Sequence, residues 1–154
     1  MVDGDRAQVY AAELAAFAGT SFEVSVALDR LVVLAHRLFA TPWWPCGTTV
    51  IRAARTDARS STTRWGGGSA PVIRLAEPQL TMATLAHELA HVLAGSGHGH
   101  DATFRRAHLD VVGELLGDVQ MEWLAEAYRL HGLGIGARTW PAPPDRAAGG
   151  PIAL

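Results

Sequence analysis

The chain has 154 residues and a mass of 16.4 kDa, which suits one domain that can bury a sizeable core. Hydrophobic residues make up 49% and charged residues 18%, so the composition excludes a disordered or strongly solvated chain. The formal net charge of -2 gives no signal for a general affinity for nucleic acid or for anionic lipid.

Three features indicate the cellular compartment. The single cysteine, Cys46, permits no internal disulfide bond. No apolar run reaches the length of a membrane span, and the first residues are acidic where a signal peptide would have a basic start. We therefore expect a cytoplasmic protein.

Two helices are expected before the first proline-rich loop. Residues 5 to 18 have apolar side chains at helical spacing, and Gly19 follows as a stop. The apolar positions of this first helix are Val9, Tyr10, Leu14 and Phe17. The stretch TSFE, from Thr20 to Glu23, resembles a capping box and predicts a second helix that ends before Pro42. The apolar side of the second helix would consist of Leu28, Leu31, Val32, Ala35 and Phe39.

Three short strands are expected next. The runs 48–55, 60–65 and 71–76 are rich in β-branched residues and are separated by polar turns and a glycine-rich loop. Pro71 begins the third run, and proline is tolerated at the start of a strand or on a sheet edge. Pro71 therefore suits an edge position, although an ordinary core strand fits the sequence equally well.

Three more helices and a tail are expected after the sheet. The spacing predicts helices over 81–94, from Asp101 or Thr103 to Gly117, and from Asp118 towards Gly132. The last helix would turn Val119, Trp123, Ala127 and Leu130 inward. Residues 133 to 154 are rich in Gly, Pro and Ala, which indicates an extended or mobile tail after a single domain of residues 1 to 132. The order of helices, sheet and helices indicates an α+β fold.

The stretch HELAH contains the strongest functional motif. His87 and His91 are four residues apart, so on a helix both imidazoles lie on one face and can bind the same metal ion. Glu88 is rotated by about 100° from His87 and can reach a water on the metal without being a ligand. Zinc lowers the pKa of such a water, and the carboxylate takes its proton as the water attacks a carbonyl. The motif therefore predicts a hydrolytic zinc site with Glu88 as general base.

A catalytic zinc site needs a third protein ligand. The metzincin spacing fails, because Gly95 and His98 each lie one residue too far from His91. The remaining candidates are two histidines after the turn and two glutamates on later helices: His98, His100, Glu114 and Glu122.

The stretch after the turn resembles a known pattern. In SprT-like and related minimal zincins, the HExxH helix is followed by a histidine four residues before a phenylalanine that begins the next helix. His100 and Phe104 match this pattern, and the run HGH...FR..H resembles a small actinobacterial group of HExxH metallohydrolases even more closely. The resemblance covers residues 71 to 117. It implies that the strand before the HExxH helix, here 71–76, is a sheet edge that pairs with an extended peptide substrate. The chain has Asp101-Ala102 where SprT has Gly-Pro, and no cysteine-rich zinc module follows, so the resemblance does not extend to DNA repair.

Local chemistry also favours His100 as the third ligand. His100 lies at the start of a helix and Phe104 can anchor it in the core, whereas His98 lies between two glycines in a flexible loop. His98 remains the alternative.

The resemblance implies a minimal zincin-like fold and a zinc-dependent metallohydrolase, with a metallopeptidase as the leading expectation. One zinc ion would be bound by His87, His91 and His100, and the partner would be a peptide or protein substrate. Two other functions remain open. One is a zinc-stabilised interaction module without turnover, and the other is hydrolysis of a non-peptide amide or ester.

Overall fold

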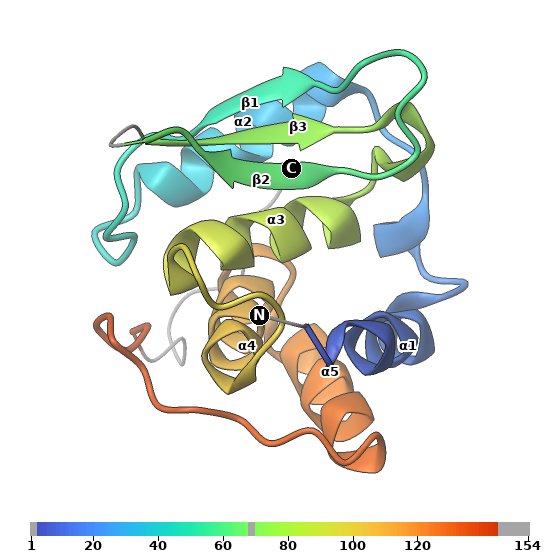
Figure 1. Ribbon diagram of the computed structural model, residues 1–154, viewed down its shortest axis with the longest axis vertical. Helices are drawn as coiled ribbons and strands as arrows, with labels where there is room; N and C mark the ends of the chain where they lie inside the picture. The colour runs from blue at the N-terminus through green and yellow to red at the C-terminus, as the bar shows by residue number, and fades with distance from the viewer. Residues whose placement is uncertain (1–2, 68–69, 145–154) are drawn as a thin grey trace.

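The computed structural model describes residues 3–67 and 70–144 (Figure 1). Its elements are the helices and strands α1 (Arg6–Phe17), α2 (Leu28–Phe39), β1 (Val50–Ala53), β2 (Thr62–Trp65), β3 (Pro71–Leu75), α3 (Met82–Ala94), α4 (Ala102–Leu115) and α5 (Asp118–Leu130). Two short 3-10 turns, Ser21–Glu23 and Glu77–Gln79, precede α2 and α3. The chain therefore has the predicted α+β fold, with the helices and strands in the expected order.

The sheet corrects the prediction of the edge strand. Its order is β1-β3-β2, with β1 parallel and β2 antiparallel to β3. The expectation that the strand at 71–76 forms an edge was wrong, because β3 is the central strand. Pro71 is tolerated there because it is the first residue of the strand and lies opposite Trp65, the last residue of β2. β2 is the edge strand next to α3.

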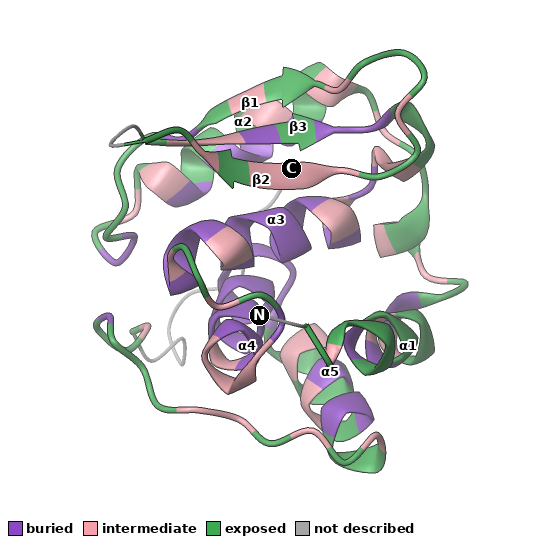
Figure 2. Ribbon diagram, viewed as in Figure 1, coloured by how far each residue is buried: buried purple, intermediate pink, exposed green. Residues whose placement is uncertain are grey.

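The helix α3 lies along one face of the sheet and separates it from α1, α4 and α5 (Figure 1). Figure 2 shows that α3 and α4 are the most thoroughly buried helices. Ile73 and Leu75 of β3 are fully buried in the same core as Leu85 and Leu89 of α3. This packing places the HELAH stretch of α3 in the middle of the molecule, between the sheet and the other helices.

Caps define the turn between α3 and α4. The hydroxyl of Thr81 accepts a hydrogen bond from the Thr84 amide at the start of α3, and Gly95 ends that helix with a φ of 90°. The Asp101 carboxylate accepts a hydrogen bond from the Phe104 amide and caps α4, as one of the two predicted caps. The turn therefore returns the chain over the end of α3 and brings residue 100 back towards it.

In α1 and α5 the face turned inward matches the prediction only in part: Val9, Phe17 and Ala127 are buried as expected. In α1 the buried residues are Val9, Ala12 and Phe17, and in α5 they are Leu124, Ala127 and Tyr128. Of the residues expected to face inward, Tyr10, Leu14, Val119, Trp123 and Leu130 are exposed. The reason in both cases is a buried polar contact: Glu13 of α1 and Tyr128 of α5 both contact the same histidine of α4.

The second helix begins later than the capping box predicted. The hydroxyl of Thr20 accepts a hydrogen bond from the Phe22 amide, but this cap begins only the 3-10 turn. The chain is then extended, and the Val26 amide donates to the carbonyl of Leu80, just before α3. The helix α2 starts at Leu28 because this tertiary hydrogen bond holds the preceding residues in an extended conformation.

The described part of the predicted tail, residues 133 to 144, forms no helix or strand. It lies against α4, and the indole of Trp43, in the loop after α2, donates to the carbonyl oxygen of Pro141. Gly136 donates a backbone hydrogen bond to Ala102, and a Cβ at Gly136 would lie 2.9 Å from that backbone. The indole of Trp140 and the guanidinium of Arg138 both bind the buried carboxylate of Asp110. The rest of the predicted tail, residues 145 to 154, lies outside the described residues. Within the described ranges, no helix has the length and apolar character needed to cross a membrane.

Candidate metal centre

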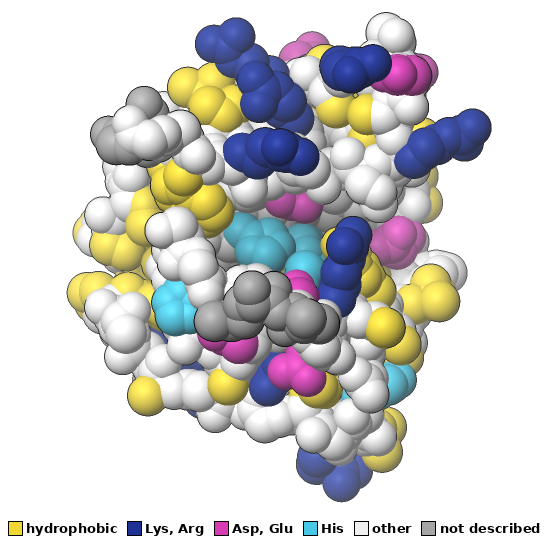
Figure 3. Space-filling model, viewed as in Figure 1, with side chains coloured by type: hydrophobic (Ala, Val, Ile, Leu, Met, Phe, Trp, Pro, Cys, Tyr) yellow, Lys and Arg dark blue, Asp and Glu magenta, His cyan; other side chains and the backbone are white. Residues whose placement is uncertain are grey.

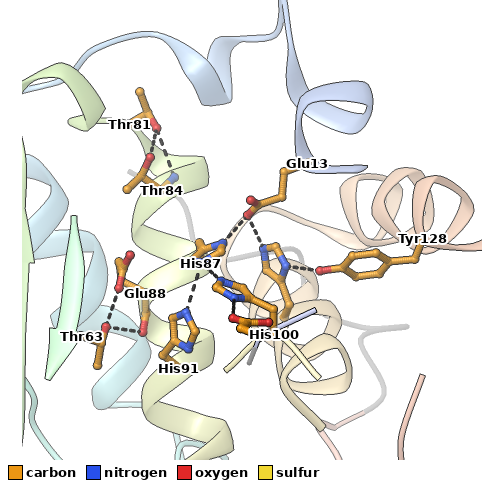
Figure 4. A network of polar contacts seen from close by, with 11 residues as sticks. Glu13, Thr63, Thr81, Thr84, His87, Glu88, His91, His100 and Tyr128 are labelled. Carbon is orange, nitrogen blue, oxygen red and sulfur yellow. Dashed lines mark hydrogen bonds and ion pairs between the residues drawn. The ribbon is translucent and has the colours of Figure 1, made fainter. Parts of the chain in front are cut away.

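Three histidine side chains converge at the surface of α3 (Figure 4). His87 and His91 extend from adjacent turns of α3, and His100 comes from the turn before α4. The Nε2 atom of His87 lies 3.1 Å from that of His100 and 3.2 Å from that of His91. A ligand nitrogen from each of the three lies within 4.8 Å of the others, so the group can hold one metal ion.

Carboxylates from the N-terminal segment orient two of these imidazoles. Glu13 of α1 lies 2.6 Å from Nδ1 of His87, and Asp3 lies 2.5 Å from Nδ1 of His100. Gly99 permits the second contact, because a Cβ there would lie 3.1 Å from the Asp3 carboxylate and the residue has a φ of 56°. Each carboxylate holds the proton on Nδ1 and leaves the lone pair of Nε2 facing the centre of the group.

The donor set fits a tetrahedral metal such as zinc. Two neutral imidazoles whose Nδ1 atoms donate to carboxylates can only accept at Nε2, so the 3.1 Å contact between His87 and His100 is not a hydrogen bond between neutral rings. It needs a cation, either a proton or a metal ion. Zinc with Zn–N bonds of about 2.0–2.1 Å in tetrahedral geometry separates ligand nitrogens by roughly 3.3 Å. The observed spacings of 3.1 and 3.2 Å are close to this value.

The electrostatics of the three imidazoles differ. Burial and the neighbouring His87 and His100 lower the pKa of His91 to about 2. Burial also lowers the pKa of His100, against the opposing effect of Asp3. Burial lowers the pKa of His87 too, but the Glu13 carboxylate outweighs it and leaves this pKa above its usual value. His91 and His100 are therefore neutral at physiological pH and can donate lone pairs to a metal.

Glu88 points away from the three imidazoles, towards the edge strand (Figure 4). The hydroxyl of Thr63 in β2 donates to Oε2 of Glu88 at 2.6 Å and also lies 3.1 Å from the Glu88 carbonyl oxygen. Burial raises the pKa of Glu88, although His87 and the Thr63 hydrogen bond lower it in part. A buried carboxylate whose pKa is raised accepts a proton more readily than an exposed one, and Glu88 lies next to His87 of the group that could hold a metal ion.

A second polar layer lies behind His87. His108 of α4 is fully buried; its Nε2 lies 3.2 Å from Glu13 and its Nδ1 lies 2.6 Å from the hydroxyl of Tyr128. Glu13, His87 and His108 form a second group whose ligand atoms lie within 4.8 Å of one another. Because Nδ1 of His87 is already bound to Glu13, we interpret this group as the support of the first one.

Aromatic rings fix the positions of the imidazoles. The ring of Phe104 is fully buried and lies 4.4 Å from that of His91 and 4.9 Å from that of His100, between centroids. The ring of Tyr10 is stacked on His87 with an interplanar angle of 8°. Phe104 therefore anchors the third histidine, as the sequence predicted, and Tyr10 covers the outer face of the first.

Arg105 holds the turn that carries His100. Its side chain is buried, and Nη1 donates both to the carbonyl oxygen of His100 and to the carboxylate of Asp5. Its Nε donates to the carbonyl oxygen of Gly134. The buried guanidinium of Arg105 thus connects the N-terminal segment, the turn and the C-terminal segment.

The structure separates the four candidates for the third ligand. His100 joins His87 and His91, whereas His98 is directed to Asp101, with its Nδ1 3.0 Å from that carboxylate. Glu114 and Glu122 belong to neither candidate metal-binding group of the described residues.

Three residues that support the site were not predicted from the sequence: Asp3, Glu13 and Thr63. Only Glu13 had a signal, because it lies four residues from both Val9 and Phe17 and so on the apolar stripe of its helix.

Two hollows meet at this group. One, of about 210 Å³, lies between β2 and the start of α1, and the other, of about 300 Å³, lies between α1 and the start of α3. Both are lined by Tyr10, Ser61 and Glu88. Figure 3 shows histidine side chains at the bottom of a hollow, with basic side chains above and beside it. The group is thus accessible from outside through a cleft.

Comparisons of the chain with models of known protein families, with curated proteins and with solved structures give no match.

Proposed function

We propose that this protein is a zinc-dependent metallohydrolase of the zincin type and that it hydrolyses peptide bonds. In this proposal His87, His91 and His100 bind one zinc ion and Glu88 is the catalytic base. The observation that carries it is the convergence of three Nε2 atoms, two of them oriented by carboxylates, beside a buried glutamate that lines the same cleft.

The chemistry follows from the positions of these groups. A zinc ion in this site would lower the pKa of a coordinated water and polarise the carbonyl of a substrate. Glu88 accepts the proton of the attacking water and then donates it to the leaving amine. Thr63 orients the Glu88 carboxylate for both transfers. Tyr10 and Phe104 pack against the imidazoles and limit their movement.

The edge strand supports a peptide as the substrate. β2 has β3 as a neighbour on one side, and Thr62, Thr63 and Arg64 line the hollow beside His91 and His100. An extended peptide can add to such an edge through main-chain hydrogen bonds, which places its carbonyl groups along the cleft. In this proposal β2, and not the strand at 71–76, is the sheet edge that pairs with the substrate. We further propose a cytoplasmic location, consistent with the single cysteine, Cys46.

The proposal is tested by metal analysis and by turnover. Protein purified without chelator should contain about one zinc ion per chain, and His87→Ala or His100→Ala should lose it. Glu88→Gln should keep the zinc and lose cleavage of a broad peptide library. Absence of zinc in the wild-type protein would overturn the proposal.

The same variant decides between catalysis and a zinc-stabilised interaction module. A structural zinc site needs no base, so equal turnover by the wild type and Glu88→Gln would favour the module. If the wild type cleaves no peptide but hydrolyses an ester or a small amide, and Glu88→Gln loses this turnover, the protein is instead a hydrolase of small molecules.

A further inference from the structure

The two hollows form one cleft whose ends differ in charge. The hollow between β2 and the start of α1 is lined by Arg6 and Arg64, and the hollow on the α3 side is lined by Glu13 and Glu23. The shared residues Tyr10 and Glu88 lie between these ends. Because Glu13 is bound to His87 and His108, the difference between the ends depends on Glu23 at one end and on Arg6 and Arg64 at the other.

The acidic groups at the basic end already have partners. Asp3 is bound to His100, and Glu88 accepts from Thr63. In contrast, Arg6 and Arg64 are exposed and form no ion pair with another described residue, although Arg6 lies 5.6 Å from the ring centroid of Tyr10. Both guanidinium groups are therefore available to an anion in the cleft.

The basic end continues onto the outer face of the sheet. Arg52 of β1 and Arg74 of β3 are paired in the strand register, and both are exposed. Residues 48 to 76 contain five arginines and a single acidic residue, Asp57, in a chain whose net charge is -2. Figure 3 shows basic side chains grouped above the hollow that contains the histidines. Like charges on neighbouring strands repel each other, and a bound anion relieves that repulsion.

We propose that this cleft selects a peptide segment that carries acidic side chains on the Arg6–Arg64 side of the scissile bond. The position of this segment relative to a cleaved bond rests on the proposed peptidase function. Binding of an acidic segment does not require turnover. Arg64 is on the edge strand that would pair with the peptide main chain, so its guanidinium lies within reach of the side chains of that peptide. Arg6, at the start of α1, lines the same hollow.

The first test measures binding without catalysis. Zinc-loaded Glu88→Gln is titrated with a fluorescein-labelled peptide of alternating glutamate and alanine, and with its lysine–alanine counterpart, and anisotropy is recorded. We expect the acidic peptide to bind roughly tenfold more tightly, and this difference to disappear when Arg6→Gln and Arg64→Gln are added. The matched control is Arg37→Gln, which removes an exposed arginine of α2 that lines neither hollow and should leave the preference intact.

The second test measures cleavage. A peptide library digested by the wild type should be enriched in Asp and Glu on one side of the cleaved bonds, and Arg6→Gln with Arg64→Gln should abolish this enrichment. Equal binding of the two labelled peptides, or a preference unchanged in the arginine double variant, would overturn the inference. Displacement of the acidic peptide by a lower concentration of single-stranded oligonucleotide would also overturn it, in favour of a nucleic-acid surface. If the protein prefers the acidic peptide in binding but cleaves no peptide, the proposed peptidase function is contradicted and the inference of an acidic binding partner stands.

Discussion

The carboxylate of Glu13 lies 2.6 Å from Nδ1 of His87, although 74 residues separate the two in the chain. This contact joins the first helix to the helix that carries the HELAH stretch. Glu13 also lies 3.2 Å from Nε2 of His108, so one carboxylate orients a candidate metal ligand and its buried neighbour. The position of α1 is therefore linked to the geometry of the candidate metal-binding group.

Replacing Glu13 with Gln tests this connection. The variant keeps the shape of the side chain but removes the charge that fixes the His87 tautomer, so we expect zinc affinity to fall by about 10- to 100-fold. Competition with a chelator of known affinity measures the change. Glu23→Gln is the control, because Glu23 lines the same hollow without contacting an imidazole. Equal affinities of Glu13→Gln and the wild type would contradict the role of Glu13.

Removal of the metal should lower thermal stability. A ligand that binds only the folded state at 100 times its Kd adds about 2.7 kcal/mol, which for a chain of this size corresponds to roughly 5–10 °C in Tm. We expect chelation to lower the Tm of the wild type by this amount and zinc to restore it. His98→Ala should show the same shift, whereas His100→Ala should show none. The opposite result for these two variants would reassign the third ligand to His98.

The local part of this site could be predicted from the sequence. His87, Glu88 and His91 lie within one helix, and their relative positions follow from its 3.6-residue period. His100 was predicted as the third ligand because it lies directly before a helix cap and four residues before an aromatic anchor. Asp101 caps α4, and Phe104 packs into the core. Each of these signals acts over a few residues.

The supporting residues could not be predicted, because their contacts are long-range. Asp3 and His100 are 97 residues apart, and Thr63 and Glu88 are 25 apart. The order of the strands could not be predicted either, because the alternation of side chains along a strand indicates which of its faces is buried. It does not indicate which strand lies next to it. The inward face of α1 was predicted only in part, because the helix contains many alanines that leave its apolar stripe poorly defined. The partly buried Glu13 lies on its inward side.

Thr63→Val tests the orientation of Glu88, the proposed catalytic base. Valine keeps the size of the side chain but cannot donate to Glu88, so we expect kcat to fall roughly tenfold while zinc content stays the same. The hydrogen bond stabilises the charged carboxylate, so its loss raises the pKa of Glu88 further and moves the acid limb of the kcat/KM profile to higher pH. Thr63→Ser should restore both. A lower kcat with an unmoved acid limb would show that Thr63 acts only through packing.

Arg138→Gln tests whether the C-terminal segment stabilises the domain. Asp110 is 3% exposed and receives hydrogen bonds from Arg138 at 2.7 and 2.9 Å and from the indole of Trp140 at 2.9 Å. Loss of the guanidinium leaves a buried carboxylate without a counter-charge. We therefore expect the free energy of unfolding, measured in urea, to fall by about 2–3 kcal/mol. Limited proteolysis should then cut within residues 133 to 144. The control is Arg129→Gln, which breaks an exposed pair with Glu126 and should leave the free energy of unfolding nearly unchanged. If both variants lose the same small amount, the segment contributes little to stability and the domain ends at residue 132.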